Sequence, residues 1–278
     1  MNYRHIFHAG NICDTVKHVV LTRLMGHLHS KDKPFCVLDT HAGIGLYDLT
    51  DSRALKTGEA QDGIFKLIAA SPLPALADYY RILRKLNRDW PHVRFYPGSP
   101  VIVRQMLRPE DRLIACELHP EDAEALRCQF RNDRQAHIHL RDGYDALSAF
   151  LPPPEKRGLV LIDPPFEERD EFEKLATALK AAHSRWAAGI FMLWYPIKDR
   201  PAIWRFHEAM VATGIPKQLV AEFTYDEAAG TDQLIGCGFL LINPPWKLDE
   251  ELGTLFPALH EALATKHRGA SVKWLTAA

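Results

Sequence analysis

The chain has 278 residues, of which 47% are hydrophobic and 25% are charged, and its formal net charge is −1. These values are typical of a folded globular protein and argue against an intrinsically disordered chain. No apolar run approaches the ~20 residues that a membrane-spanning helix needs, so no membrane association is expected. A net charge near zero argues only weakly against nucleic acid, because binding depends on a local basic face.

The first ten residues, MNYRHIFHAG, contain no apolar segment and no cleavage pattern, so we do not expect a signal peptide. The chain has five cysteines, an odd number, and none forms a Cys-x-x-Cys pair. This usage is typical of a reducing cytoplasm rather than of a disulfide framework or a zinc ribbon. No His spacing typical of a metal site occurs, so we expect a cytoplasmic protein without a metal.

Short apolar runs alternate with helical stretches along most of the chain, which predicts an α/β fold with a mostly parallel sheet. Seven strands are expected, at residues 35–39, 113–117, 137–142, 159–163, 190–195, 218–223 and 235–242. Helices are expected between them, at residues 15–29, 121–131, 144–150, 172–183 and 202–213. Only a loop separates the last two strands, which indicates an antiparallel hairpin that closes the edge of the sheet.

Residues 46–97 are too many for an ordinary connection between neighbouring strands. Two helix-like pieces, at 59–70 and 74–87, predict a small helical insertion at about residues 47–97 within a single domain that spans residues 1–278. Residues 79–112 overlap this insertion and contain eight Lys or Arg but three acids. A solvated helix surface explains such a segment by itself, so it becomes informative only beside a catalytic motif.

A glycine loop follows the first predicted strand, in the sequence Leu38-Asp39-Thr40-His41-Ala42-Gly43-Ile44-Gly45. Glycines allow a close approach of the backbone to a ligand. The G-x-G-x-x-G fingerprint of dinucleotide sites is absent, and an acid before a single G-x-G turn is typical of S-adenosylmethionine sites. Glu117 and Asp142, with Gly143 after it, end the next two strands, and ligands bind beyond the carboxyl ends of such strands. We expect Glu117 to bind ribose hydroxyls and Asp142 to bind the adenine amine.

The sequence Asp163-Pro164-Pro165-Phe166 ends the fourth strand and indicates the reaction. The lone pair of an adenine N6 amine is delocalised into the ring, and two acceptors on its N–H bonds would direct that lone pair to a methyl donor. Asp163 supplies a carboxylate, and Pro164 supplies a carbonyl that two prolines keep out of a helix. Phe166 offers a flat face for a base taken out of its stack. Positioning and electrostatics then carry the methyl transfer.

A second tetrapeptide, Asn243-Pro244-Pro245-Trp246, fits the same pattern. It follows the seventh strand, in the predicted edge hairpin, whereas Asp163 follows a strand expected beside the glycine loop. We therefore assign catalysis to Asp163 and interpret residues 243–246 as a structural turn.

Several further motifs, together with those above, resemble one family over nearly the whole chain. These motifs are Tyr3-Arg4-His5-x-Phe7-His8-Ala9-Gly10-Asn11, Lys17-His18, Tyr96-Pro97-Gly98-Ser99-Pro100, Glu117-Leu118-His119-Pro120 and Ile242-Asn243-Pro244-Pro245-Trp246-Lys247-Leu248. The chain resembles the RlmJ family of 23S ribosomal RNA adenine-N6 methyltransferases, a family also described in the catabolism of external DNA. The sequence shows no carboxylate cluster typical of a two-metal nuclease, so we do not expect the chain itself to cleave DNA.

The resemblance implies a Rossmann-like class I methyltransferase fold, S-adenosylmethionine as cofactor and one adenine of 23S ribosomal RNA as substrate, in free RNA rather than the assembled ribosome. By matching motif, it implies cofactor contacts at His18, His41, Ser99, Glu117, Asp142, Gly143 and Asp163. It also implies catalysis at Asp163 and an RNA contact at Tyr3. The family often has Tyr where this chain has Phe166, so a hydrogen bond from that position is not expected.

Two alternatives remain open from the residues. A DNA adenine-N6 methyltransferase would use the same tetrapeptide, although no recognisable DNA-reading domain is appended, and RNA loops offer unstacked bases. A nucleic-acid-binding protein without catalysis, linked to the use of external DNA, would share the fold, but the complete set of strand-end acids argues against it.

Overall fold

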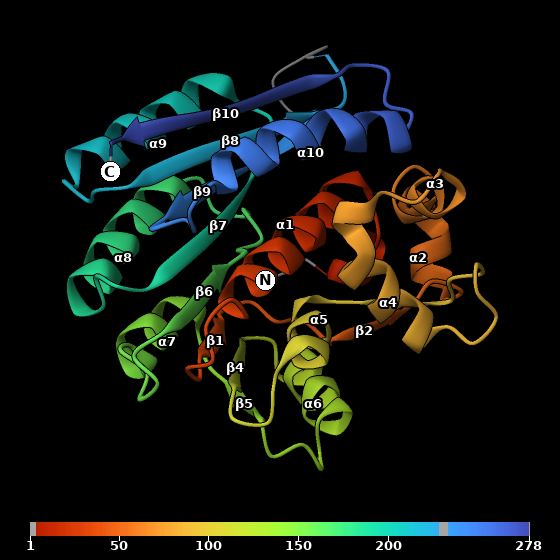
Figure 1. Cartoon of the computed structure of the whole chain (residues 1–278), viewed down its shortest axis with the longest axis horizontal. Coiled ribbons are helices and arrows are strands. Elements are labelled where there is room, and N and C mark those ends of the chain that lie inside the picture. Colours follow the sequence, from red (N-terminus) through yellow and green to blue (C-terminus); the bar gives the residue numbers. More distant parts are fainter. Residues whose placement is uncertain (1–3, 228–232, 278) are drawn as a thin grey trace.

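A computed structural model describes residues 4–227 and 233–277. Its centre is an eight-stranded sheet in the order β10-β8-β9-β7-β6-β1-β4-β5, with helices on both faces (Figure 1). The strands are β1 (Cys36–Asp39), β4 (Arg112–Glu117), β5 (Ala136–Leu140), β6 (Gly158–Ile162), β7 (Ile190–Ile197), β8 (Gln218–Thr224), β9 (Gly236–Ile242) and β10 (Gly269–Thr276). The predicted α/β class with a mostly parallel sheet and an antiparallel hairpin is confirmed.

Five strands, β5, β4, β1, β6 and β7, form the parallel half of the sheet. β1 and β6 are buried along their whole length, which is why they appear in the sequence as continuous apolar runs. Parallel strands end at the same edge of a sheet, so Asp39 at the end of β1, Glu117 at the end of β4 and Asp163 just after β6 approach one another.

The other half of the sheet is antiparallel, and here the sequence prediction was incomplete. β9 runs antiparallel to both β7 and β8, as the predicted hairpin requires. The hairpin does not close the sheet, however, because β10 pairs antiparallel with β8 and forms the edge. Its side chains are half-buried or exposed, so β10 lacks the continuous apolar run that revealed the seven predicted strands.

The helices that flank the sheet are α1 (Ile12–Leu28), α5 (Ser99–Met106), α6 (Pro120–Gln129), α7 (Gly143–Phe150), α8 (Glu171–Arg185), α9 (Arg200–Ala212) and α10 (Leu248–Ala262). The sequence analysis missed α5 and α10. The helix α5 begins with Ser99 and Pro100 directly after β3, and this Pro-rich sequence looked like a turn. Within the described residues, no helix has the length and apolar character to cross a membrane.

The long connection between β1 and β4 carries a two-stranded antiparallel sheet of β2 (Leu46–Asp48) and β3 (Phe95–Pro97). Between these strands lie α2 (Ser52–Thr57), α3 (Ile64–Ala69) and α4 (Ala77–Leu86), with the 3-10 turns η2 (Glu59–Gln61) and η3 (Pro74–Leu76). Another 3-10 turn, η1 (His5–Phe7), precedes α1. The short strands and α2 were not predicted, since elements of three to six residues leave little periodicity.

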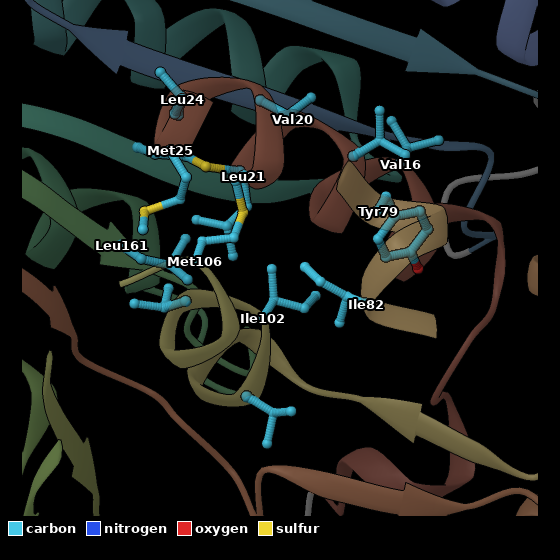
Figure 2. Close-up of a cluster of buried hydrophobic side chains, with 14 of the residues drawn as sticks. Val16, Val20, Leu21, Leu24, Met25, Tyr79, Ile82, Ile102, Met106 and Leu161 are labelled. Carbon is cyan, nitrogen blue, oxygen red and sulfur yellow. The ribbon is translucent and has the colours of Figure 1, made fainter. Parts of the chain in front are cut away.

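The helix α1 lies at the centre of the molecule, between the sheet and helices α2 to α4 (Figure 1). Figure 2 shows its apolar side chains, including Val20, Leu21 and Met25, beside residues of α4, α5 and β6. All three side chains are fully buried. Because nearly the whole first half of α1 is also buried, its polar residues must find partners inside the protein. Asp14, Lys17 and His18 are such residues, and all three line the cavity described below.

Candidate active site

A cavity of about 370 Å³ opens at the carboxyl ends of β1, β4 and β6. Ligand sites in proteins are concave and of this order of size. Its lining contains every predicted site residue that the structure describes: His18, His41, Ser99, Glu117, Asp142, Gly143, Asp163, Pro164 and Phe166. Tyr3 lies outside the described residues. The folded chain thus gathers residues that are up to about 150 positions apart in the sequence around one cavity.

The glycine loop and Glu117 are joined by direct hydrogen bonds. The Gly43 N–H donates to Glu117 Oε2 at 2.8 Å, and the His119 N–H donates to Oε1 at 2.8 Å. Gly43 has φ +61°, and a Cβ there would lie 2.3 Å from the Tyr47 hydroxyl, so only glycine fits. A carboxylate has about four acceptor positions, so Glu117 keeps acceptor capacity toward the cavity for a ligand with two hydroxyls.

Asp142 caps the N-terminus of α7, where its Oδ1 accepts from the N–H groups of Tyr144 at 2.8 Å and Asp145 at 3.1 Å. Both bonds use one carboxylate oxygen, so the second oxygen can accept from a ligand amine. A Cβ on Gly143 would come within 2.6 Å of the His41 ring and 2.7 Å of the Thr40 carbonyl. The backbone of Gly143 therefore packs against Thr40 and His41 so closely that a larger residue would not fit there.

The two histidines predicted as cofactor contacts are neutral, and His18 is fully buried whereas His41 is half-buried. Burial lowers the pKa of His41 to about 4 and that of His18 to about 3. His41 Nδ1 lies 2.8 Å from the Thr40 hydroxyl, and His18 Nδ1 lies 2.8 Å from the Tyr96 hydroxyl. The Tyr79 hydroxyl donates to Tyr96, which leaves the Tyr96 proton for His18 Nδ1. His18 then carries its proton on Nε2.

Asp39, the acid at the end of β1, is fully buried. Neither of its carboxylate oxygens has a well-aligned hydrogen-bond partner among the described residues, although the Ser99 hydroxyl is close. Burial, with the nearby charge of Asp163, raises the pKa of Asp39 to about 7. Asp39 does not itself line the cavity, but its neighbours Ser99 and Asp163 do.

Asp163 is bound by a lysine that the sequence analysis did not select. Lys17 Nζ lies 2.6 Å from Asp163 Oδ2 and 2.8 Å from Asp14 Oδ1, and all three side chains are largely buried. Burial acts to lower the pKa of Lys17, but Asp14 and Asp163 outweigh it and hold that pKa well above its ordinary value. The sequence contained a signal: Asp14 and Lys17, one helical turn apart, interrupt an apolar helix and therefore require partners.

The aromatic side chain of the tetrapeptide at residues 163–166 lines the same cavity. Phe166 has a left-handed backbone, with φ +51°. Its ring centroid lies 5.1 Å from that of Phe172 and 6.0 Å from that of Trp194, and the rings are tilted or edge-on to one another. Aromatic neighbours in such arrangements hold a ring in place, so the face of Phe166 is a fixed surface beside Asp163.

The second tetrapeptide lies at the opposite end of the sheet. β9 is antiparallel to its neighbours, so its last residue, Ile242, pairs with Phe191 at the start of β7 and with Gln218 at the start of β8. Asn243 Nδ2 donates to the carbonyls of Ala187 at 2.7 Å and Gly189 at 2.9 Å. The expected position of this turn at the edge of the sheet was wrong, because β9 is an interior strand.

No group of three or more His, Cys, Asp or Glu side chains in residues 4–227 and 233–277 is arranged to hold a metal ion. The cavity therefore combines neutral histidines, strand-end carboxylates, a glycine loop and one buried lysine–carboxylate pair. This donor set suits an organic ligand with amine and hydroxyl groups.

Comparisons with known proteins find relatives that match nearly the whole chain. The family model described as "Ribosomal RNA large subunit methyltransferase D, RlmJ" matches residues 32–276. The chain is 40% identical over 277 residues to ribosomal RNA large subunit methyltransferase J of Escherichia coli K12, and 37% identical over 278 residues to the protein of that name from Haemophilus influenzae. Each alignment covers 99% of both chains.

A solved structure shows the same fold over nearly the whole chain. The crystal structure of protein LPL1258 from Legionella pneumophila is 32% identical to this chain, with a TM-score of 0.89. The alignment covers 96% of this chain and 98% of the other. With the family match and the two full-length relatives, these findings show that the chain belongs to the RlmJ family of ribosomal RNA large subunit methyltransferases.

Proposed function

We propose that this protein transfers the methyl group of S-adenosylmethionine to the N6 amine of one adenine in 23S ribosomal RNA. The observation that carries the proposal is the Asp163 carboxylate, held by Lys17 and flanked by the Phe166 ring, in a cavity that also contains the glycine loop and Glu117. Membership of the RlmJ family supports the same reaction and cofactor.

The residues of the cavity fit the cofactor. Glu117 has acceptor positions for ribose hydroxyls, Asp142 has a free carboxylate oxygen for the adenine amine, and the Gly43 loop allows close approach. His18, His41 and Ser99 complete the proposed set and line the same cavity. When bound, S-adenosylmethionine supplies an electrophilic methyl group on a positively charged sulfur.

The protein's own part in the reaction is to hold the target amine. The Asp163 carboxylate and the Pro164 carbonyl accept the two N–H bonds of N6, which directs the nitrogen lone pair toward the methyl group. Lys17 fixes the direction of the Asp163 carboxylate, because its Nζ lies 2.6 Å from Asp163 Oδ2. The amine loses one proton once the new C–N bond forms, and the hydrogen-bonded Asp163 oxygen is the nearest acceptor. Phe166 stacks on the extruded base.

Proposed contacts outside the cavity concern the N-terminus and the insertion. We place Tyr3 against the RNA. Its neighbour Arg4 forms ion pairs with Glu121 and with Asp122, which lines the cavity. We treat residues 1–278 as one methyltransferase domain in which residues 47–97 form a helical insertion, because β2 and β3 pair and enclose α2 to α4.

We further propose that the protein acts in the cytoplasm on 23S RNA before the ribosome is assembled. The Asp163 carboxylate is only 16% exposed, so the target adenine must leave its stack and enter the cavity. Such extrusion demands free access to the RNA around the base, which packed ribosomal structure would restrict.

The test is transfer of labelled methyl from S-adenosylmethionine to three substrates from a strain lacking the gene: free 23S RNA, assembled large subunits and genomic DNA. We expect N6-methyladenosine at one position of free 23S RNA, identified by nuclease digestion and mass analysis. Equal or greater labelling of DNA would show that DNA, and not RNA, is the substrate. Greater labelling of assembled subunits would contradict the preference for free RNA. If no substrate were labelled and the cofactor did not raise the thermal stability, a binding protein without catalysis would be indicated.

A further inference from the structure

Asp14 is a buried carboxylate of α1 that contacts four groups beside the candidate site. Its side chain is 3% exposed, and it contacts Lys17 Nζ at 2.8 Å, His5 Nε2 at 3.2 Å and His18 Nε2 at 3.5 Å. The Gly10 N–H also donates to Asp14 Oδ2, at 3.0 Å. Two of these partners precede α1 and two lie within it, so Asp14 joins the N-terminal segment, residues 4–11, to the helix.

The chain of contacts continues from Asp14 to the reacting end of the site. Lys17 lies between Asp14 and Asp163, with its Nζ at 2.8 Å from one carboxylate and 2.6 Å from the other. A buried ammonium between two carboxylates cannot shift toward one without losing contact with the other. The position of Lys17, and through it the direction of the Asp163 carboxylate, therefore depends on Asp14.

We propose that Asp14 is a positioning residue for methyl transfer, which holds Lys17 against Asp163 and couples this pair to the placement of the N-terminal segment through His5 and Gly10. This inference rests on the proposed function, because Asp163 is taken as the acceptor of the target amine. Asp14 itself does not touch the substrate base or the methyl donor in this role.

Charge balance inside the site supports this role. Lys17 is buried, and its pKa lies above the ordinary value because Asp14 and Asp163 together outweigh the effect of burial. The other titratable groups whose charge interacts with Lys17 come from several elements: His18 in α1, Asp39 at the end of β1, Tyr79 in α4 and Cys237 in β9. His18 is neutral at physiological pH, and burial raises the pKa of Tyr79 and Cys237, which keeps both uncharged there. The pKa of Asp39 is about 7, so its charge changes near neutral pH.

Glu59 offers a matched control. It lies in η2 and binds the same N-terminal segment, with His8 Nδ1 at 3.0 Å and Asn11 Nδ2 at 2.8 Å. Both carboxylates therefore fix residues 4–11, but Asp14 also binds Lys17. A loss of activity caused only by loosening of this segment should appear in both Glu59→Gln and Asp14→Asn.

The first experiment compares Asp14→Asn, Glu59→Gln and the unmodified protein by kcat and KM for methyl transfer to free 23S RNA. We expect Asp14→Asn to lower kcat by about 100-fold, the size of effect that a misplaced catalytic group produces, with the KM for S-adenosylmethionine nearly unchanged. With one carboxylate removed, the Lys17 pKa falls, so the alkaline limb of kcat should move to lower pH. Glu59→Gln should leave that limb in place.

The second experiment is a double-mutant cycle with Lys17→Met. If Asp14 acts through Lys17, then Asp14→Asn should change kcat by less than about twofold in the Lys17→Met background. The double variant also lacks the buried ammonium that Asp14→Asn leaves paired with Asp163 alone, so it remains informative if Asp14→Asn by itself does not fold.

The outcomes separate this inference from the proposed function. An inactive unmodified protein would overturn the proposed function itself. An active unmodified protein, with Asp14→Asn at full kcat or with effects that match Glu59→Gln, would overturn the role of Asp14 alone. Additive losses in the cycle would show that Asp14 does not act through Lys17.

Discussion

The tetrapeptides at residues 163–166 and 243–246 share one sequence pattern but have different surroundings in the folded chain. Asp163 follows a parallel strand and is bound by buried Lys17, at the end of the sheet that carries the cavity. Asn243 follows an antiparallel strand at the other end, where its amide donates to two backbone carbonyls. Phe166 packs among aromatic rings, whereas Trp246 is 84% exposed.

The difference shows that strand direction, as much as residue type, decides what such a motif can do. Parallel strands bring their final residues to one edge, where Asp163 meets side chains from β1, β4 and α1. The reversal of β9 carries Asn243 away from them. At the cavity end, Lys17 holds the Asp163 carboxylate in place, and at the other end the Asn243 amide binds two backbone carbonyls.

The largest expected effect comes from removing the first residue of each tetrapeptide. Asp163→Ala should lower kcat for methyl transfer by at least about 100- to 1,000-fold, because the amine loses its charged acceptor. Cofactor binding, followed by calorimetry, should persist. Asn243→Ala is the matched variant and should keep its activity. An active Asp163→Ala together with an inactive Asn243→Ala would assign catalysis to the wrong end of the sheet.

Phe166 and Trp246, the aromatic residues of the two tetrapeptides, should also differ, with a loss of activity expected only when Phe166 is replaced. Stacking of a base on an aromatic side chain contributes about 1–3 kcal/mol, so Phe166→Ala should lower kcat/KM for RNA roughly 5- to 150-fold. Trp246→Ala should leave kcat/KM unchanged. Phe166→Tyr tests whether a hydroxyl at this position adds anything, and we expect nearly full activity because the stacking face is kept. Equal losses for Phe166→Ala and Trp246→Ala would contradict the stacking role.

Asn243→Asp should affect stability instead of catalysis. The substitution replaces a donor with a carboxylate that faces the carbonyls of Ala187 and Gly189, which should lower the free energy of unfolding by about 1–3 kcal/mol. Urea denaturation measures this loss, and methyl transfer well below the unfolding temperature should be unchanged. An unchanged midpoint would mean that the two hydrogen bonds do not stabilise the turn.

The last prediction concerns a pH dependence at the cavity end of the sheet. The pKa of Asp39 is about 7 in the folded protein, above its ordinary value of 3.8. Between these values the folded state binds a proton that the unfolded state has lost, so the Asp39 contribution to stability decreases as pH rises from about 4 to 7. Asp39→Asn removes this contribution. Its stability relative to the unmodified protein, from urea curves at several pH values, should therefore increase through that window. A constant difference would contradict the raised pKa.

The sequence predicted most of the parallel sheet, because buried strands such as β6 are continuous apolar runs and each is followed by a recognisable turn. It also predicted the residues of the cavity wall that end strands, including Glu117 and Asp163. It missed β2, β3 and β10, since short or half-exposed elements leave no clear period in the chain. It also missed α5, whose first residues looked like a turn, and α10, although Leu248, Leu252, Leu255 and Leu259 recur there at helical spacing.

The sequence by itself determined the α/β class, the glycine loop and the tetrapeptide whose residue types suit an adenine amine, because these depend on local pattern and side-chain chemistry. The sequence already favoured Asp163 over Asn243, but only the tertiary structure showed the reason, because Asn243 is carried to the other end of the sheet by the direction of β9. The tertiary structure also decided that Lys17 and Asp14 belong to the site. Their contacts join α1 to the loop after β6, 146 residues away, and pairing over such a distance is set by packing and burial instead of sequence spacing.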